Sequence, residues 1–335
     1  MVVQSGMVGP TGTAPPAVEV QGLEKHFGAV TAVAGVSFTV AAGEVFAFLG
    51  PNGAGKSTVI NILCTLMRPS SGRAWVGGYD VLAQPQAVRG RIGLVFQEPT
   101  LDQQLTAEEN LRFHAVLYRV PKRLRAQRID RVLALVGLAE RRDALVSTFS
   151  GGMARRLEIA RGMLHTPAVL FLDEPTIGLD PQTRALMWED VLTLRREEGV
   201  TIFLTTHYLD EAEVADRIAI IDDGLLVALD TPERLKASVG ADTVELHTSD
   251  DAAALLAVQA AGYRAVGGPE SITVFTADGE SQVGGLVEAV GGGVKLVHVH
   301  RPTLDDVFLH YTGRQIREQA GEGRSEMAMA WGHRR

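Results

Sequence analysis

Cysteine is almost absent from this sequence, since Cys64 is the only one among 335 residues. A single thiol excludes an intramolecular disulfide and a cysteine-based metal cluster. Cys64 lies in an apolar stretch that follows a glycine-rich segment, so we expect a small buried residue there rather than a reactive thiol.

Long hydrophobic runs and an excess of positive charge are also lacking. No stretch approaches the roughly 18 to 20 continuous apolar residues of a membrane span, and the N-terminus lacks the charged-then-apolar pattern of a secretory signal. We therefore expect a cytoplasmic location. The net charge of −8 argues against a dominant nucleic-acid-binding surface, so no nucleic-acid partner is expected, although the composition allows a local basic patch.

The composition divides the chain into four segments. Residues 1–17 are rich in Gly, Pro, Thr and Ser and are expected to be a disordered tail, and the polar residues 314–335 a flexible tail. Residues 18–237 are expected to form the main domain. Residues 240–313 are expected to form a small regulatory or assembly domain, which agrees with about two domains for a chain of this length.

The main domain is predicted to be α/β. Its short apolar strands alternate with longer helical stretches, which is typical of a mostly parallel sheet. Strand-like alternation over 18–40 predicts an antiparallel β subdomain. A capping box at Thr106 opens a helical region that reaches residue 138 and is interrupted near Pro121. The parallel strands are expected at 45–49, 92–96, 168–172, 200–206 and 217–221.

The small domain has the predicted order βαββαβ, followed by a helix from Thr303. His298 and His300 alternate onto one strand face, but no acidic or thiol ligand is nearby in the sequence, so we expect a polar strand face rather than a metal site. Phe308 is expected to be a buried anchor, in a segment that either contacts a partner or only caps its own domain. The strands are expected at 243–248, 264–267, 272–276 and 294–300, and the helices at 251–262 and 280–290.

A glycine-rich loop follows the first parallel strand and matches the phosphate-binding pattern G-x-x-x-x-G-K-[ST]. Its glycines let successive N–H groups turn inward, and the N-terminus of the next helix adds positive potential. Lys56 would supply a charge for the β- and γ-phosphates, and Ser57 would be a Mg²⁺ ligand. The loop therefore predicts a nucleotide site, formed by Gly50, Pro51, Asn52, Gly53, Ala54, Gly55, Lys56, Ser57 and Thr58.

Two carboxylates end the apolar strand at 168–172, at the edge where parallel α/β sheets place their ligands. Asp173 is expected to hold Mg²⁺, through water, and Glu174 to polarise the water that attacks the γ-phosphate. Gln97 and His207 each follow another strand and place a polar side chain at the same edge.

A serine and two glycines, Ser150, Gly151 and Gly152, stand just before a helix and about a hundred residues after the phosphate loop. With this segment in place, residues 18–235 resemble an ATP-binding-cassette (ABC) ATPase, with all the expected motifs in order. The resemblance implies an ABC-type P-loop cassette with a helical subdomain. It also implies further roles: stacking on adenine for Phe27, the Q-loop and Mg²⁺ for Gln97, the D-loop for Asp180, and the switch histidine for His207.

This family works as a head-to-tail dimer. The resemblance therefore implies a homodimer in which Ser150 and Gly152 contact the γ-phosphate held by the other subunit. ATP and Mg²⁺ are the implied cofactors, and the implied catalytic residues are Lys56, Gln97, Glu174 and His207.

Further segments are similar to the daunorubicin-resistance-type ATPases of ABC-2 exporters, and this similarity extends nearly to Gly313. It implies ATP-driven export of a drug-like or hydrophobic molecule through a permease on a separate chain, with this chain on the inner face of the cell membrane. Two positions depart from the family: Ala154 replaces a common basic residue, and Gly162 replaces alanine at a cost of about 1 kcal/mol of helix propensity. The similar segments are 95–102, 105–106, 109–111, 148–153 and 301–309.

Two other functions compete with transport. A soluble ATPase that remodels a macromolecular complex usually needs a long coiled-coil insertion or two cassettes in one chain, and neither is present. A nucleotide-binding scaffold without hydrolysis is disfavoured by the intact Glu174 and His207.

Overall fold

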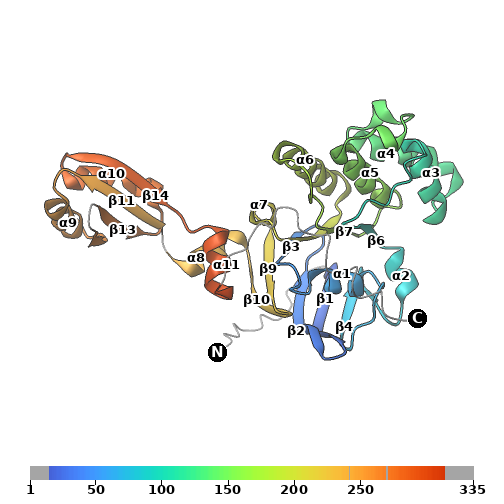
Figure 1. The fold of residues 1–335 in the computed structure, drawn as a ribbon, viewed down its shortest axis with the longest axis horizontal. Helices are drawn as coiled ribbons and strands as arrows, with labels where there is room; N and C mark the ends of the chain where they lie inside the picture. The colour runs from blue at the N-terminus through green and yellow to red at the C-terminus, as the bar shows by residue number, and fades with distance from the viewer. Residues whose placement is uncertain (1–14, 241, 269–270, 314–335) are drawn as a thin grey trace, which may run out of the picture. The chain divides into compact units, whose positions relative to one another are not determined.

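The computed structural model describes residues 15–240, 242–268 and 271–313, which form two compact units (Figure 1). The predicted tails at 1–14 and 314–335 lie outside these ranges. Ala17, which we had assigned to the first tail, is buried and donates a backbone hydrogen bond to Val40. The contacts change from the first unit to the second between Leu229 and Asp230, earlier than the predicted domain end at 237.

The first unit is built on a six-stranded sheet with the order β10-β9-β3-β8-β7-β6. The neighbours from β9 to β6 pair in parallel, as the alternation of strands and helices predicted. Every residue of β3, β7 and β8 is buried, because helices and a second sheet cover the two faces. The strands are β3 (Val45–Leu49), β6 (Ile92–Val95), β7 (Val169–Asp173), β8 (Thr201–Thr206), β9 (Arg217–Asp222) and β10 (Leu225–Asp230).

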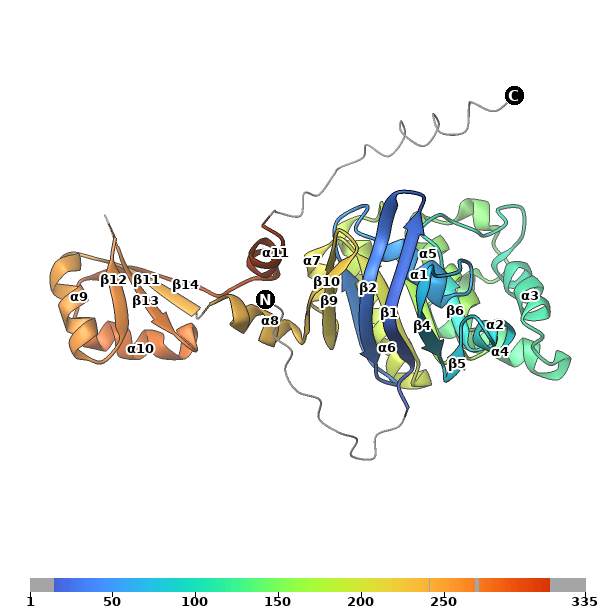
Figure 2. The same ribbon diagram turned by 90° about the horizontal axis from the view of Figure 1, so that it is seen from below.

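A four-stranded antiparallel sheet, with the order β2-β1-β4-β5, packs against this parallel sheet (Figure 2). Its strands are β1 (Val18–Phe27), β2 (Val30–Val40), β4 (Ser71–Val76) and β5 (Tyr79–Asp80). The two sheets meet in an aromatic cluster in which Phe38 of β2 contacts Phe46 and Phe48 of β3, with ring centroids 5.3 and 5.5 Å apart. Phe171 and Phe203 extend the cluster along β7 and β8.

Helices form the rest of the first unit. The capping box at Thr106 is confirmed, because its hydroxyl accepts from the N–H of Glu109 while the Glu109 carboxylate accepts from the N–H of Thr106. A 3₁₀ turn after Pro121 interrupts the helical region as predicted. The helices are α1 (Lys56–Leu63), α2 (Pro85–Arg89), α3 (Ala107–Leu117), α4 (Arg125–Leu135), α5 (Gly151–Met163), α6 (Pro181–Glu198) and α7 (Leu209–Ala212).

The second unit has the predicted order βαββαβ, in an antiparallel sheet β12-β13-β11-β14 with one face covered by α9 and α10. His298 and His300 are exposed on β14, and Phe308 is fully buried on α11. α8 (Pro232–Val239) packs on α11 (Leu304–Thr312), which explains the early domain boundary. The other elements are β11 (Asp242–Thr248), α9 (Asp251–Ala260), β12 (Arg264–Gly267), β13 (Ile272–Thr276), α10 (Gly279–Val290) and β14 (Val294–His300). Among the helices in the described ranges, none has the length and apolar character needed to span a membrane.

Candidate active site

The glycine-rich loop between β3 and α1 is held tightly by neighbouring strands. Gly53 and Gly55 have φ angles of 84° and 103°, a conformation that L side chains rarely adopt. A Cβ on Gly50 would lie 2.4 Å from the Ile221 carbonyl oxygen, and one on Gly55 would lie 2.4 Å from that of Ala32. Glycine is therefore required at Gly50 and Gly55 by the surrounding backbone, and favoured at Gly53 by its φ angle alone.

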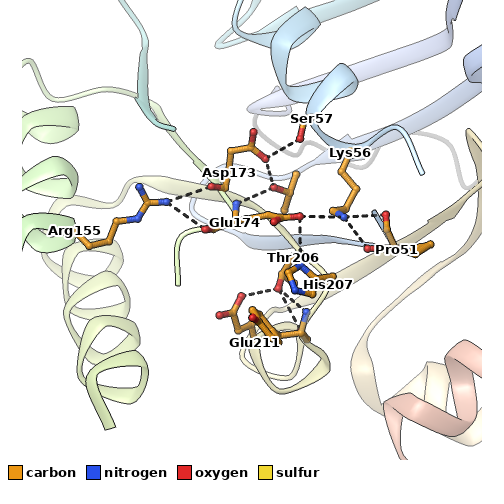
Figure 3. Close-up of polar contacts among 12 residues, drawn as sticks. Pro51, Lys56, Ser57, Arg155, Asp173, Glu174, Thr206, His207 and Glu211 are labelled. Atoms are coloured by element: carbon orange, nitrogen blue, oxygen red, sulfur yellow. Dashed lines mark hydrogen bonds and ion pairs between the residues drawn. The ribbon is translucent and has the colours of Figure 1, made fainter. Parts of the chain in front are cut away.

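Lys56, the first residue of α1, is buried under this loop. Its Nζ donates to the carbonyl oxygens of Gly50 at 2.8 Å and Pro51 at 3.1 Å, and lies 3.2 Å from Glu174 Oε1 (Figure 3). Burial lowers the pKa of the Lys56 ammonium, although the nearby Glu174 carboxylate acts in the opposite direction. The loop thus brings a positive charge to the carboxyl edge of the parallel sheet.

Asp173 is the last residue of β7 and is joined to the loop by Ser57. Asp173 Oδ1 accepts from the Thr205 hydroxyl at 2.5 Å and from the Ser57 hydroxyl at 3.4 Å. Burial raises the pKa of Asp173, and the two hydroxyls only partly compensate. Carboxylate and hydroxyl oxygens are hard ligands of the kind that Mg²⁺ prefers, so Ser57 and Asp173 fit this ion.

Glu174, the residue after Asp173, has a strained backbone conformation. Its φ is 45°, and its N–H donates to the carbonyl and hydroxyl oxygens of Thr205 at 3.2 and 3.1 Å. Burial would raise the pKa of Glu174, but His207 Nδ1 at 3.4 Å and the Lys56 ammonium outweigh it and hold this pKa below its usual value. A non-glycine residue in the left-handed region costs about 1 to 3 kcal/mol and is common at functional sites.

Arg155, on the first turns of α5, was not identified from the sequence. It is buried, and its guanidinium donates to the carbonyl oxygens of Pro175 at 2.6 Å, Asp173 at 3.2 Å and Glu174 at 3.4 Å, and to that of Phe96. Arg155 therefore holds the ends of β6 and β7 to one helix. The basic pair at 155–156 was the only available signal, and it does not indicate which carbonyls are bound.

Gln97 and Phe27 lie apart from this cluster. Gln97 is exposed just beyond β6, and within the described residues no hydrogen bond joins it to Ser57 or Asp173. Phe27 ends β1 with 47 % of its surface exposed, and Lys25 Nζ lies 5.0 Å from its ring centroid. Nearly half of the Phe27 surface is thus exposed, with the Lys25 ammonium over the ring.

The serine–glycine segment begins α5, with Ser150 and Gly151 exposed and Gly152 buried. Ser150 is the N-cap and accepts from the N–H of Met153 at 3.3 Å, and Gly151 is exposed. Gly152 is buried, and a Cβ there would lie 2.2 Å from Thr183 Cγ2 of α6. Across the described part of the chain, no hydrogen bond or ion pair links Ser150 to Lys56 or Glu174.

Asp180 caps the N-terminus of α6 with its side chain. The carboxylate accepts from the N–H of Thr183 at 3.0 Å and from its hydroxyl at 2.6 Å, and these bonds lower the pKa of Asp180. Within a single chain, the hydrogen bonds of the Asp180 side chain are therefore those of a helix N-cap.

Known proteins with similar sequences are ABC transporter ATP-binding proteins. A family model described as ABC transporter matches residues 33–177. The chain is 40% identical over 316 residues to the daunorubicin resistance ATP-binding protein DrrA3 of Streptomyces coeruleorubidus, covering 92% of this chain and 100% of that protein. It is 38% identical to the linearmycin resistance ATP-binding protein LnrL of Bacillus subtilis, covering 90% and 100%. The chain belongs to the family of ABC transporter ATP-binding proteins.

Solved structures of this family share the fold of the first unit. An ATP-binding subunit of an ABC transporter is 31% identical, with a TM-score of 0.59 over 66% of this chain and 92% of that one. A dimeric cassette in a post-hydrolysis state, bound to ADP and Pi, is 26% identical with a TM-score of 0.58 over 64% and 98%. This ABC transporter ATP-binding protein is an ATPase, and the prediction of an ABC-type cassette is confirmed.

Proposed function

We propose that this chain is the ATP-hydrolysing subunit of an exporter that removes a drug-like or hydrophobic molecule through a permease on a separate chain. The observation that carries the proposal is the buried cluster of Lys56, Glu174 and His207 at the end of the phosphate loop. The resistance functions named for the relatives support the type of cargo.

In this proposal the phosphate loop and Lys56 bind the β- and γ-phosphates of ATP. Ser57 and Asp173, with Gln97, would hold Mg²⁺, which would neutralise phosphate charge when bound. Glu174 orients the attacking water, and its lowered pKa keeps the carboxylate ionised for that role. Most of the rate acceleration then comes from positioning and electrostatics, as is usual in phosphoryl transfer.

Two copies of the chain act together. Ser150 and the N–H groups that begin α5 contact the γ-phosphate held by the other subunit, because a helix N-terminus favours bound phosphate. Closure of the dimer on two ATP molecules switches the permease to its outward-facing state, and hydrolysis resets it. The dimeric cassette among the structural relatives supports this arrangement. The subunits lie on the inner face of the cell membrane.

The test is export in cells. If the adjacent reading frame encodes a six-span membrane protein, the chain is co-expressed with that protein, and accumulation of a fluorescent anthracycline is measured. We expect accumulation to fall with the wild-type chain and to stay high with Lys56→Ala. Equal accumulation with both chains, each present at the same level, would contradict the proposed cargo, while ATP hydrolysis by the purified chain tests the enzymatic part separately.

A further inference from the structure

Glu211, on α7, is a buried carboxylate that the mechanism above does not use. Only 1 % of its surface is exposed, and its Oε2 accepts from the Thr206 hydroxyl at 2.6 Å (Figure 3). The same hydroxyl accepts from the N–H of Tyr208 at 2.9 Å. Glu211 therefore orients the hydroxyl that fixes the turn from β8 to α7, and His207 is the residue at the centre of that turn.

Arg184, from the first turns of α6, reaches the same place. Its guanidinium lies 4.2 Å from the centroid of the Tyr208 ring, and its Nε lies 3.9 Å from Glu211 Oε1. Both of these atoms are buried, and within the described residues neither has a hydrogen-bond partner. The partly buried guanidinium of Arg184 thus packs over the Tyr208 ring and beside the Glu211 carboxyl group, which ties α6 and α7 together here.

This contact continues to the catalytic residues. The Tyr208 ring lies 4.1 Å from the His207 ring, measured between centroids, and His207 Nδ1 lies 3.4 Å from Glu174 Oε1. At the other end, the backbone N–H of Arg184 donates to the Asp180 carbonyl oxygen at 2.9 Å. An unbroken series of contacts thus runs from the start of α6 to Glu174.

We propose that Arg184, Tyr208 and Glu211 form a positioning cluster that couples the start of α6 to the ring of His207. The cluster acts through His207, so it rests on the role that the proposed function gives to that residue. Movement of α6 shifts Arg184, which carries the Tyr208 ring and with it the imidazole. Displacement of a positioned group by about 1 Å can lower a rate by roughly 10²-fold, so small shifts at Asp180 would be felt at Glu174.

The first test replaces the arginine in the full-length chain. We expect Arg184→Met, which keeps the length of the side chain but removes the charge, to lower kcat for Mg·ATP hydrolysis by roughly 10- to 100-fold. The affinity for a fluorescent ATP analogue should not change. Arg184→Lys should restore part of kcat because it retains a cation over Tyr208. Arg196→Met, an exposed position on the same helix, is the matched control and should leave kcat unchanged.

A cycle with His207→Ala then separates positioning from a general structural effect. If the cluster acts through His207, Arg184→Met has no further effect on kcat once the imidazole is removed. An equal loss in both backgrounds, or wild-type kcat in Arg184→Met, overturns the proposal while leaving the proposed function intact. Wild-type kcat in His207→Ala would instead show that His207 does not contribute to hydrolysis, which would contradict the cluster proposal as well.

Substitution of the tyrosine gives a second measure that does not depend on the folding of the Arg184 variants. Tyr208→Phe keeps the ring over Arg184 and His207, so we expect nearly wild-type kcat. Tyr208→Ala removes the ring and should lower kcat as Arg184→Met does, again only when His207 is present. Equal kcat in Tyr208→Phe and Tyr208→Ala, with unchanged melting temperatures, would contradict the proposal.

Discussion

The Lys56 ammonium lies 3.2 Å from the Glu174 carboxylate, and both side chains are almost fully buried. His207 contacts the same carboxylate oxygen at 3.4 Å. Glu174 is therefore placed between the phosphate loop and the turn after β8, and it can respond to changes at either one.

Replacement of Glu174 should separate binding from hydrolysis. We expect Glu174→Gln to slow ATP hydrolysis by roughly 10²- to 10⁴-fold, because it removes a general-base contribution, while the phosphate loop still binds ATP. An ATP-stabilised dimer should accumulate and can be seen by size-exclusion chromatography. Glu197→Gln, at an exposed position of α6, serves as the control. Near-normal turnover of Glu174→Gln would show that Glu174 does not orient the attacking water.

The shared site predicts complementation between two defective subunits. Lys56→Ala should bind ATP poorly, whereas Ser150→Arg should bind it normally and fail in closure. A mixed dimer with one of each has one composite site with both defects and one with neither, so ATPase activity should exceed that of both homodimers. Activity no higher than in the homodimers would mean either that Ser150 does not act on the partner's nucleotide or that the two sites are strongly coupled.

Stability should depend on pH through Glu211. Burial raises its pKa to about 7, so the folded chain keeps a proton that the unfolded chain releases above pH 4.5. Stability is therefore lost as pH rises from about 4.5 to 7, by at most about 3.5 kcal/mol at 1.4 kcal/mol per pH unit. The side chain in Glu211→Gln stays neutral at every pH. The free energy of unfolding in urea of this variant, minus that of the wild type, should therefore be larger at pH 8 than at pH 5.5. The same difference at both pH values would contradict this assignment.

Phe27 should contribute stacking without selecting the base. Phe27 is 47 % exposed, and stacking contributes about 1 to 3 kcal/mol for any base, so Phe27→Ala should weaken ATP and GTP binding to a similar extent. Isothermal titration calorimetry checks this, with Phe113→Ala, another exposed phenylalanine, as the control. Unchanged ATP affinity in Phe27→Ala would place the adenine elsewhere.

Removal of the second unit should spare ATP binding. We had placed the end of the cassette at residue 237, but α8 packs on α11, so a cut there would leave Leu235 without its partner helix. A chain ending at Asp230 keeps all of β10, and we expect it to fold and to bind ATP like the full chain, with export reduced. A chain ending at Val239 should be less soluble. Loss of ATP binding in the shorter chain would show that the second unit is part of the cassette fold.

The parallel strands and the phosphate loop could be predicted because their signals are local. Apolar runs such as 45–49 become buried strands wherever both faces of a sheet are covered, and the loop glycines are required by backbone contacts. The order of the second unit was readable for the same reason, since each of its short strands and helices has its own pattern.

Residues whose roles depend on packing could not be found in this way. Arg155 binds carbonyl oxygens at the end of β7 and just beyond the end of β6, and the contact of Arg184 with Glu211 joins two helices. A sequence shows the charge of such residues but not the hydrogen-bonding or ionic partner that stabilises them when they are buried. The domain boundary was misplaced for a similar reason, because the partner of α8 lies about 65 residues later in the chain.

The pairing of α8 with α11 also sets an order of events during synthesis. The last strand of the cassette leaves the ribosome before α8, so the nucleotide site can form while the second unit is still incomplete. α8 has no partner until α11 has been synthesised. At a synthesis rate of about 5 to 20 residues per second, the apolar face of α8 therefore stays uncovered for several seconds. During this interval the nascent chain already has a finished catalytic domain, and the emerging helix is the part that a chaperone would be expected to protect.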